Sequence, residues 1–180
     1  MLASYYKYED KLETNRLITR FLTIDDKKTW TEFCGDPACT EFFADFGVYD
    51  AEGLAKFWIE RQLGRYKEKR YGHHALISKQ TGAFIGQCGL LLQEVDGIQE
   101  LEVGYSIMHR YWGQGFAPEA AKMFMEYASL NKLADSIISI IDKKNFRSQR
   151  VAEKNGLAIE KETNWSGLEV YIYRIALPLR

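Results

Sequence analysis

A glycine-bearing loop between a strand pattern and a helix pattern is the feature that most constrains this chain. Apolar residues alternate with polar or small ones over 101–107, which is the two-residue period of a β-strand. Glycines follow in 113–117, and 118–130 then has apolar residues at helical spacing. Pro118 suits the first turn of a helix. The chain is therefore expected to turn sharply from a sheet into a helix at this point.

The loop has two possible roles. Small residues at Gly113, Gly115 and Ala117 allow a ligand to approach the backbone closely. The unpaired amides at the start of the following helix favour negative charge. The segment therefore predicts a pyrophosphate site, although a purely structural tight turn gives the same glycines. A dinucleotide-binding GxGxxG motif needs glycine where Pro118 stands, and no P-loop Gly-Lys-Ser/Thr occurs.

The remaining pattern indicates a mixed α/β domain. Strand patterns cover 17–22, 74–78, 84–92, 101–107, 135–141, 157–163 and 170–177. Helix patterns cover 27–33, 52–66, 118–130 and 146–154, the last with Asn145 as N-cap. Charged residues on the polar side of 52–66, Arg61 and Arg65 among them, are interpreted as a solvated face. With 180 residues and no Pro/Gly/Ser-rich linker, 1–180 is predicted to be one domain.

Composition excludes several classes of partner. The formal net charge is −1, so the basic excess of a nucleic-acid binder is missing. No apolar run approaches the roughly 20 residues that span a bilayer, and no signal-peptide pattern is present. We therefore expect a cytoplasmic protein with no membrane partner. Cys34, Cys39 and Cys88 form no CxxC pair, which argues against a disulfide framework and a metal site.

The loop and its surroundings resemble the GNAT superfamily of N-acetyltransferases, in its RimJ/RimL-like branch. Trp112-Gly113-Gln114-Gly115-Phe116-Ala117 resembles the family's acetyl-coenzyme A loop, with Trp where Gln or Arg is usual. Segments 84–89, 102–107 and 145–157 also resemble family segments in order and spacing. The resemblance covers nearly the whole chain from about Leu12. It implies a mostly antiparallel seven-stranded sheet with splayed fourth and fifth strands and helices on both faces.

The family resemblance implies acetyl transfer from acetyl-coenzyme A (acetyl-CoA) directly to a primary amine. The implied cofactor-binding residues are Val103, Tyr105, Ile107, Trp112, Gly113, Gln114, Gly115, Phe116, Ala117, Asn145 and Ser148. In the family, the strand backbone pairs with pantetheine and the loop amides take the pyrophosphate. A non-catalytic acyl-CoA-binding or sensing module is the alternative.

Two residues match family positions with catalytic roles. Glu102 matches the candidate general base, acting through water, although a structural ion pair would also explain it. Glu94 and Glu100 are weaker alternatives for the base. Ser148 matches a hydroxyl that faces the coenzyme sulfur, although capping of a helix is an alternative role. His73, His74 and His109 are expected to have structural or solvent roles.

The sequence alone does not identify the amine acceptor. Either a protein N-terminal α-amine or a small-molecule amine fits the resemblance, and an acyl group longer than acetyl remains possible. Segment 42–49 is expected to build the acceptor pocket. The candidate carboxylates for binding a cationic amine are Asp36, Glu41, Asp45, Asp50 and Glu52. A homodimer through 170–177 is a further expectation.

Overall fold

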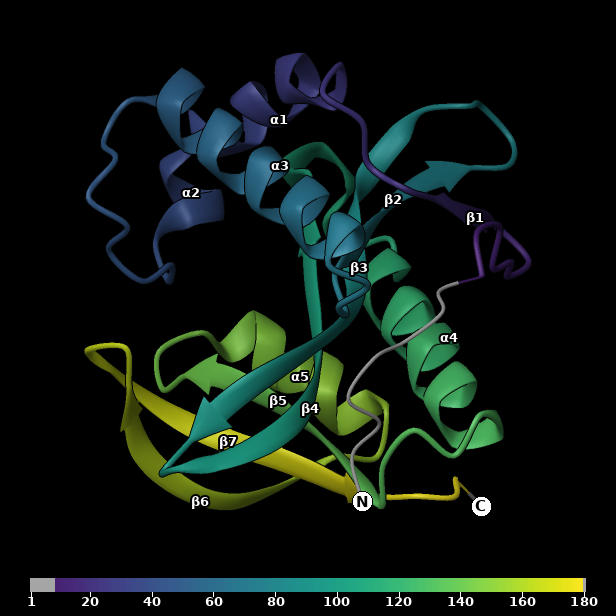
Figure 1. Cartoon of the computed structure of the whole chain (residues 1–180), viewed down its shortest axis with the longest axis vertical. Coiled ribbons are helices and arrows are strands. Elements are labelled where there is room, and N and C mark those ends of the chain that lie inside the picture. The colour runs from purple at the N-terminus through teal and green to yellow at the C-terminus, as the bar shows by residue number, and fades with distance from the viewer. Residues whose placement is uncertain (1–8, 180) are drawn as a thin grey trace.

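The computed structural model describes residues 9–179 and shows one seven-stranded sheet with helices on both faces (Figure 1). The strand order is β1-β2-β3-β4-β5-β7-β6. The strands are β1 (Leu17–Arg20), β2 (His73–Ser78), β3 (Phe84–Val95), β4 (Ile98–Ile107), β5 (Ser136–Asp142), β6 (Ala158–Trp165) and β7 (Leu168–Ala176). Neighbouring strands pair antiparallel except β4 and β5, which are parallel. The predicted fold class is confirmed.

The helices lie in two groups. They are α1 (Asp26–Cys34), α2 (Pro37–Thr40), α3 (Ala51–Lys67), α4 (Phe116–Leu130) and α5 (Phe146–Lys154), with a 3₁₀ turn at His109–Tyr111. Figure 1 shows α1, α2 and α3 gathered at one end of the molecule and β6 and β7 at the other. The long β3–β4 hairpin connects the two ends.

Side-chain alternation along β4 divides the sheet into two faces, because successive side chains of a strand point to opposite sides. Val103 packs with the apolar residues of α4, such as Phe124, in the larger core. Ala75 on β2 instead packs with Trp30 of α1 and Ile59 of α3 in a second core. Glu102 and Gly104 lie on this second face. The helical face formed by α1 and α3 therefore stands opposite the α4 face.

The parallel pair β4–β5 separates soon after it forms. Within residues 9–179, the two strands share a single registered pair, Glu102 with Ile138. The Ser139 hydroxyl also donates to the Val103 carbonyl at 3.2 Å. Beyond this point β4 continues to Ile107 while paired only with β3. The predicted splay between the fourth and fifth strands is confirmed.

One short helix and several boundaries differ from the sequence prediction. The helix α2 has only four residues, too few to give a periodic pattern, and begins at Pro37 behind the Asp36 cap. The β3–β4 strands extend to the tight turn at Asp96 and Gly97, both with positive φ. In contrast, the helix predicted over 146–154 is confirmed at both ends. Among the described residues, no helix is long and apolar enough to cross a membrane.

Candidate active site

The glycine loop turns the chain through conformations that favour glycine. Gly113 and Gly115 have φ of 74° and 79°, in the left-handed region. Gly115 is the N-cap of α4 and has no side chain to satisfy the first amides of the helix. A Cβ at Gly113 would meet nothing within 4 Å, so the outer side of the loop is open. This open cradle at a helix N-terminus fits a pyrophosphate group.

Contacts from the start of the chain brace the loop. Arg16 Nη1 donates to the Gln114 carbonyl at 2.9 Å, and Arg16 Nε donates to Glu119 of α4 at 2.6 Å. The same guanidinium lies 4.4 Å from the centre of the Phe116 ring. The Gln114 amide side chain donates back to the Arg110 carbonyl. The loop is therefore held from two sides, and its amides are positioned before any ligand arrives.

The edge of β4 that faces β5 has an open stretch of backbone. Met108 N donates to Ile85 of β3, whereas the Val103 carbonyl accepts from Ser139 of β5. Because backbone groups alternate along a strand, odd-numbered residues of β4 face the β5 side. The open stretch consequently presents the backbone of Tyr105 and the amide of Ile107, whose carbonyl accepts from the Trp112 side chain. This is the edge to which an extended pantetheine arm would pair.

Glu102 lies at the closed end of this stretch. One carboxylate oxygen accepts from Gln93 Nε2 at 2.7 Å, and the other accepts from Ile140 N at 3.4 Å. The side chain is buried on the α3 face, and burial raises the pKa of the carboxyl above its usual range, opposed by these two hydrogen bonds. A buried carboxylate with a raised pKa is a suitable proton acceptor.

The other two carboxylates considered for the base differ from Glu102. Glu100 forms a two-point ion pair with Arg174, at 2.6 and 3.1 Å, and is thereby fixed in a structural role. Glu94 lines the cavity but is exposed at the end of β3. Glu102 is consequently the carboxylate best placed at the point where β4 and β5 separate.

Helix α5 closes the opposite side of the strand gap. The Asn145 side chain accepts from Ser148 N at 3.1 Å, so Asn145 caps the helix as predicted. The capping role considered for Ser148 therefore belongs to Asn145. The Ser148 carbonyl accepts from Tyr105 Oη at 3.0 Å, which joins α5 to β4. Ser148 itself lines the cavity.

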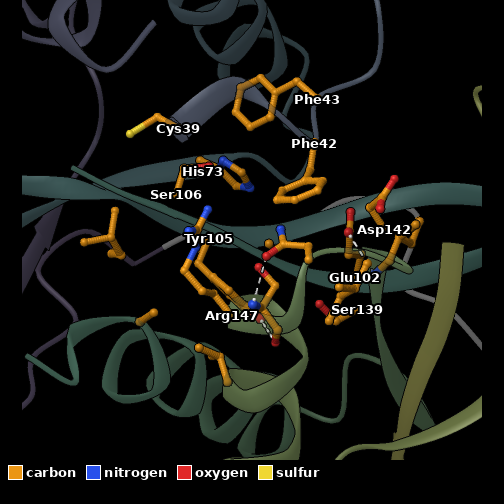
Figure 2. Close-up of a pocket in the computed structure, with 18 of the residues that line it drawn as sticks. Cys39, Phe42, Phe43, His73, Glu102, Tyr105, Ser106, Ser139, Asp142 and Arg147 are labelled. Carbon is orange, nitrogen blue, oxygen red and sulfur yellow. Dashed lines mark hydrogen bonds between the residues drawn. The ribbon is translucent and has the colours of Figure 1, made fainter. Parts of the chain in front are cut away.

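A cavity of about 700 Å³ joins these features. Figure 2 shows Phe42, Phe43 and His73 on one side of β4, with Arg147 on the other. The sequence-predicted site residues that line it are Glu102, Tyr105, Ile107, Trp112, Gly113, Gly115, Phe116, Ala117, Asn145 and Ser148. Val103 and Gln114 do not line it: Val103 is buried in the α4 core, and Gln114 lies on the outside of the loop.

Trp112, the position that departs from the family pattern, has a defined role in the mouth of the cavity. Its indole N–H donates to the Ile107 carbonyl at 2.7 Å. The Arg147 guanidinium lies 4.2 Å from the ring centre, a cation–π contact between α5 and the loop. Trp112 therefore satisfies one backbone group of the open β4 edge and holds Arg147 beside the glycine loop.

The end of the cavity near α3 contains residues that the sequence interpretation missed. Arg61 and Arg65 line the cavity; the interpretation of this face as solvated is wrong for Arg65, which is buried, and holds for Arg61, which is exposed. His73 also lines it, with 4% of its surface exposed. The spacing of the α3 residues in the sequence could have predicted that they share one face. Arg61 lies three residues after Trp58 and Arg65 seven residues after it, a spacing that places all three on one helix face.

The five carboxylates proposed for acceptor binding lie outside the lining of this cavity. Asp36 contacts His109 Nδ1 at 2.6 Å, and Asp50 accepts from Gly53 N as the α3 cap. Asp45 accepts from the Tyr49 hydroxyl at 3.2 Å. By contrast, Phe42, Phe43 and Phe46 of segment 42–49 do line the cavity, and the role of this segment as the acceptor pocket stays a prediction.

The fold and the site are those of an acyl-CoA-dependent transferase, and comparisons identify the family. The family model for the acetyltransferase (GNAT) domain matches residues 16–158, so the chain belongs to the GNAT family and is an acetyl-CoA-dependent acetyltransferase. The uncharacterized protein YkkB of Bacillus subtilis is 32% identical over 156 residues, covering 84% of this chain and 87% of YkkB. The uncharacterized N-acetyltransferase p20 of Bacillus licheniformis is 25% identical, covering 85% of this chain and 84% of p20.

Solved structures share the fold over nearly the whole chain. An acetyltransferase from Agrobacterium tumefaciens has a TM-score of 0.78 at 22% identity, covering 97% of this chain and 99% of that protein. RimL, a ribosomal-protein alpha-N-acetyltransferase solved with coenzyme A, has a TM-score of 0.77 at 11% identity, covering 93% of this chain and 98% of RimL. At these identities the likeness concerns the fold. Among residues 9–179, no cluster of three or more His, Cys, Asp or Glu side chains is placed to hold a metal ion.

Proposed function

We propose that the protein is an N-acetyltransferase that transfers the acetyl group of acetyl-CoA directly to a primary amine in a ternary complex. One observation carries the proposal. The open β4 edge leads from the glycine loop to Glu102, and this path lines one continuous cavity. A carboxylate with a raised pKa thus stands where a thioester would end if pyrophosphate occupied the loop.

The cofactor supplies an activated acetyl group, and the chain holds it through backbone groups. The amides of Gln114, Gly115, Phe116 and Ala117 would bind the pyrophosphate at the N-terminus of α4. The backbone of Tyr105 pairs with pantetheine as an added strand would. Asn145 stands on the facing helix, close enough to the gap to line it. This arrangement directs the thioester toward Glu102.

Glu102 and Ser148 divide the proton transfers. Glu102 accepts a proton from the acceptor ammonium, directly or through water, so that the free amine can attack the thioester carbonyl. The new C–N bond forms as the C–S bond breaks. Ser148 relays the amine's second proton to the departing thiolate, giving the amide and free coenzyme A. The two residues approach the strand gap from its two sides, as these two roles require.

Membership of the RimJ/RimL-like branch and action on protein N-terminal α-amines stay predictions from the sequence. The RimL likeness supports them through the fold. A homodimer and a cytoplasmic location also stay predictions. For the dimer, β7 is paired on both edges, with β5 and β6, so strand pairing of a second copy to β7 has no free edge.

The test is release of free thiol from acetyl-CoA in the presence of an amine panel. The panel holds peptide N-termini, amino acids, polyamines and aminoglycosides. We expect turnover with one class, and loss of that turnover in Glu102→Gln without loss of acetyl-CoA binding. Tight binding of coenzyme A with no turnover on any amine would contradict the proposal and favour the binding module.

A further inference from the structure

The α3 face of the cavity is the place where an acceptor would meet charged side chains. Trp58, Arg61, Gln62 and Arg65 follow one another at helical spacing, and all four line the cavity. The polar groups of the neutral residues Trp58 and Gln62 form hydrogen bonds within the protein. Trp58 Nε1 donates to Gln87, and Gln62 Oε1 accepts from His73 N at 2.9 Å. The two guanidinium groups therefore set the charge of this wall.

The two arginines have different environments. Arg65 is buried and donates from Nη1 to Gln62 Oε1 at 3.2 Å. Its positive charge also acts on Glu102, where it opposes the rise in the pKa of the carboxyl. Arg61 is exposed to the cavity, and its guanidinium lies 5.8 Å from the centre of the Phe46 ring. Across residues 9–179, no carboxylate lies within ion-pair distance of Arg61.

His73 gives a second, independent sign of a ligand. Neither ring nitrogen has a hydrogen-bond partner in the described part of the chain, although the side chain is almost fully buried. Buried polar groups without partners are uncommon. A Cβ at Gly104 would lie 2.7 Å from His73 Nε2, so the ring rests directly on β4 beside Glu102. Burial, followed by the charge of Arg65, lowers the pKa of His73 to about 3, so the ring is neutral and can accept a hydrogen bond.

The charge of the wall argues against a simple cationic amine as the acceptor. A polyamine or aminoglycoside would place further ammonium groups against Arg61 and Arg65, and like charges repel. Glu94, Glu102 and Asp142 also line the cavity, but none of them lies within ion-pair distance of Arg61. An acceptor with an acidic group next to its amine would instead pair with Arg61 while its amine reached Glu102.

We propose that the acceptor is a primary amine that also carries a carboxylate. Arg61 binds the carboxylate, and the amine lies between His73 and Glu102. This inference rests on the proposed function and narrows its substrate class. The carboxylate has two possible sources, namely the α-carboxylate of a free amino acid or an acidic side chain near the N-terminus of a peptide.

The test compares acceptors that differ only in the carboxylate. One arm uses alanine against alaninamide, and the other uses peptides that begin alanyl-aspartyl against alanyl-asparaginyl. We expect kcat/KM to be about tenfold or more higher for the carboxylate member in one arm, since a hydrogen bond to a charged group contributes roughly 1.5–3 kcal/mol. The arm that shows the preference identifies the source.

Variants then locate the preference. Arg61→Met should lower the ratio of kcat/KM between the carboxylate acceptor and its neutral partner to near one, mainly by raising KM for the carboxylate acceptor. Arg61→Lys should retain part of this preference, and Arg61→Glu should reverse it. Lys56→Met is the matched control, because Lys56 lies on the same helix, pairs with Glu60 and does not line the cavity. Equal kcat/KM within both pairs, or a preference that persists in Arg61→Glu, would overturn the inference while leaving the N-acetyltransferase intact. No thiol release with any amine would contradict the proposed function, and with it the inference.

Discussion

The two ends of the cavity are made from different parts of the polypeptide. The proposed cofactor end consists of backbone: the open edge of β4 and the loop at Gly113 and Gly115, which have positive φ. The proposed acceptor end consists of side chains, among them Arg61, His73 and Phe42. One end is therefore fixed by the fold, and the other by individual residues.

Because of this difference, the two ends of the cavity should tolerate different changes in sequence. Backbone amides are the same in every sequence that adopts the turn, so the cofactor end requires only the glycines and the helix start. Side chains at the acceptor end can change one at a time without altering the sheet. Substitutions should consequently separate into those that affect acetyl-CoA binding and those that affect the acceptor.

The largest expected effect is at the cofactor end. Gly115→Asp would set a negative charge against the pyrophosphate, and we expect acetyl-CoA affinity to fall by about 100-fold, since like-charge contacts in an interface cost several kcal/mol. Isothermal titration calorimetry measures this directly. Gly82→Asp is the control, because Gly82 has a similar φ of 71° and open space around it in a distant turn. Unchanged affinity in Gly115→Asp would remove the loop from the cofactor site.

Glu102→Gln should greatly slow catalysis while the protein still binds acetyl-CoA and the acceptor. We expect kcat to fall by about 10²-fold or more, the usual contribution of a general base. The KM for acetyl-CoA should stay within a few-fold of the original value. Glu94→Gln serves as the control at the same cavity wall. An equal loss in Glu94→Gln, or full activity in Glu102→Gln, would show that the base lies elsewhere.

The pH dependence of kcat/KM is a second test of Glu102 as the general base. Burial raises the pKa of Glu102, and the carboxylate acts as base only when deprotonated. Activity is therefore lost as the pH falls through this raised value, so the acid limb of kcat/KM should lie above the usual carboxyl range. A pH–rate profile measures it, and the limb should vanish in Glu102→Gln. A limb that persists unchanged in that variant would contradict the assignment.

Gly104→Ala tests whether the acceptor end can be altered alone. The added Cβ would lie 2.7 Å from His73 Nε2 and must displace the buried ring. Overpacking of this kind costs about 1–3 kcal/mol, and thermal unfolding should show that loss. We expect a higher KM for the acceptor with unchanged acetyl-CoA affinity. A matched loss of acetyl-CoA affinity would show that the two ends are not independent.

Ser148→Ala should have the smallest effect. The coenzyme thiol has a pKa near that of a free thiol, about 8.5, so its thiolate leaves readily without assistance. We therefore expect kcat to fall only a few-fold, with acetyl-CoA binding retained. Steady-state kinetics at saturating acceptor measures the change. Full turnover in this variant would remove Ser148 from the proton relay.

The loop of the proposed cofactor end was predictable from sequence, because its signals are local. Glycine spacing and the strand period are local signals, and they placed the 113–117 loop correctly before α4. The acceptor end depends on which helix face meets the sheet. Arg65 is buried by the docking of α3, a tertiary event that a charge pattern does not reveal. His73 is likewise placed in the cavity by the pairing of β2 with β3, opposite Gly89.

The central claim is that acetyl-CoA binds along the open edge of β4 and in the glycine loop. Amide hydrogen–deuterium exchange, measured with and without saturating acetyl-CoA, tests it most directly. The account predicts slower exchange in 103–107 and 113–117, with little change in α1. Unchanged exchange in both segments, under conditions where calorimetry shows binding, would contradict it.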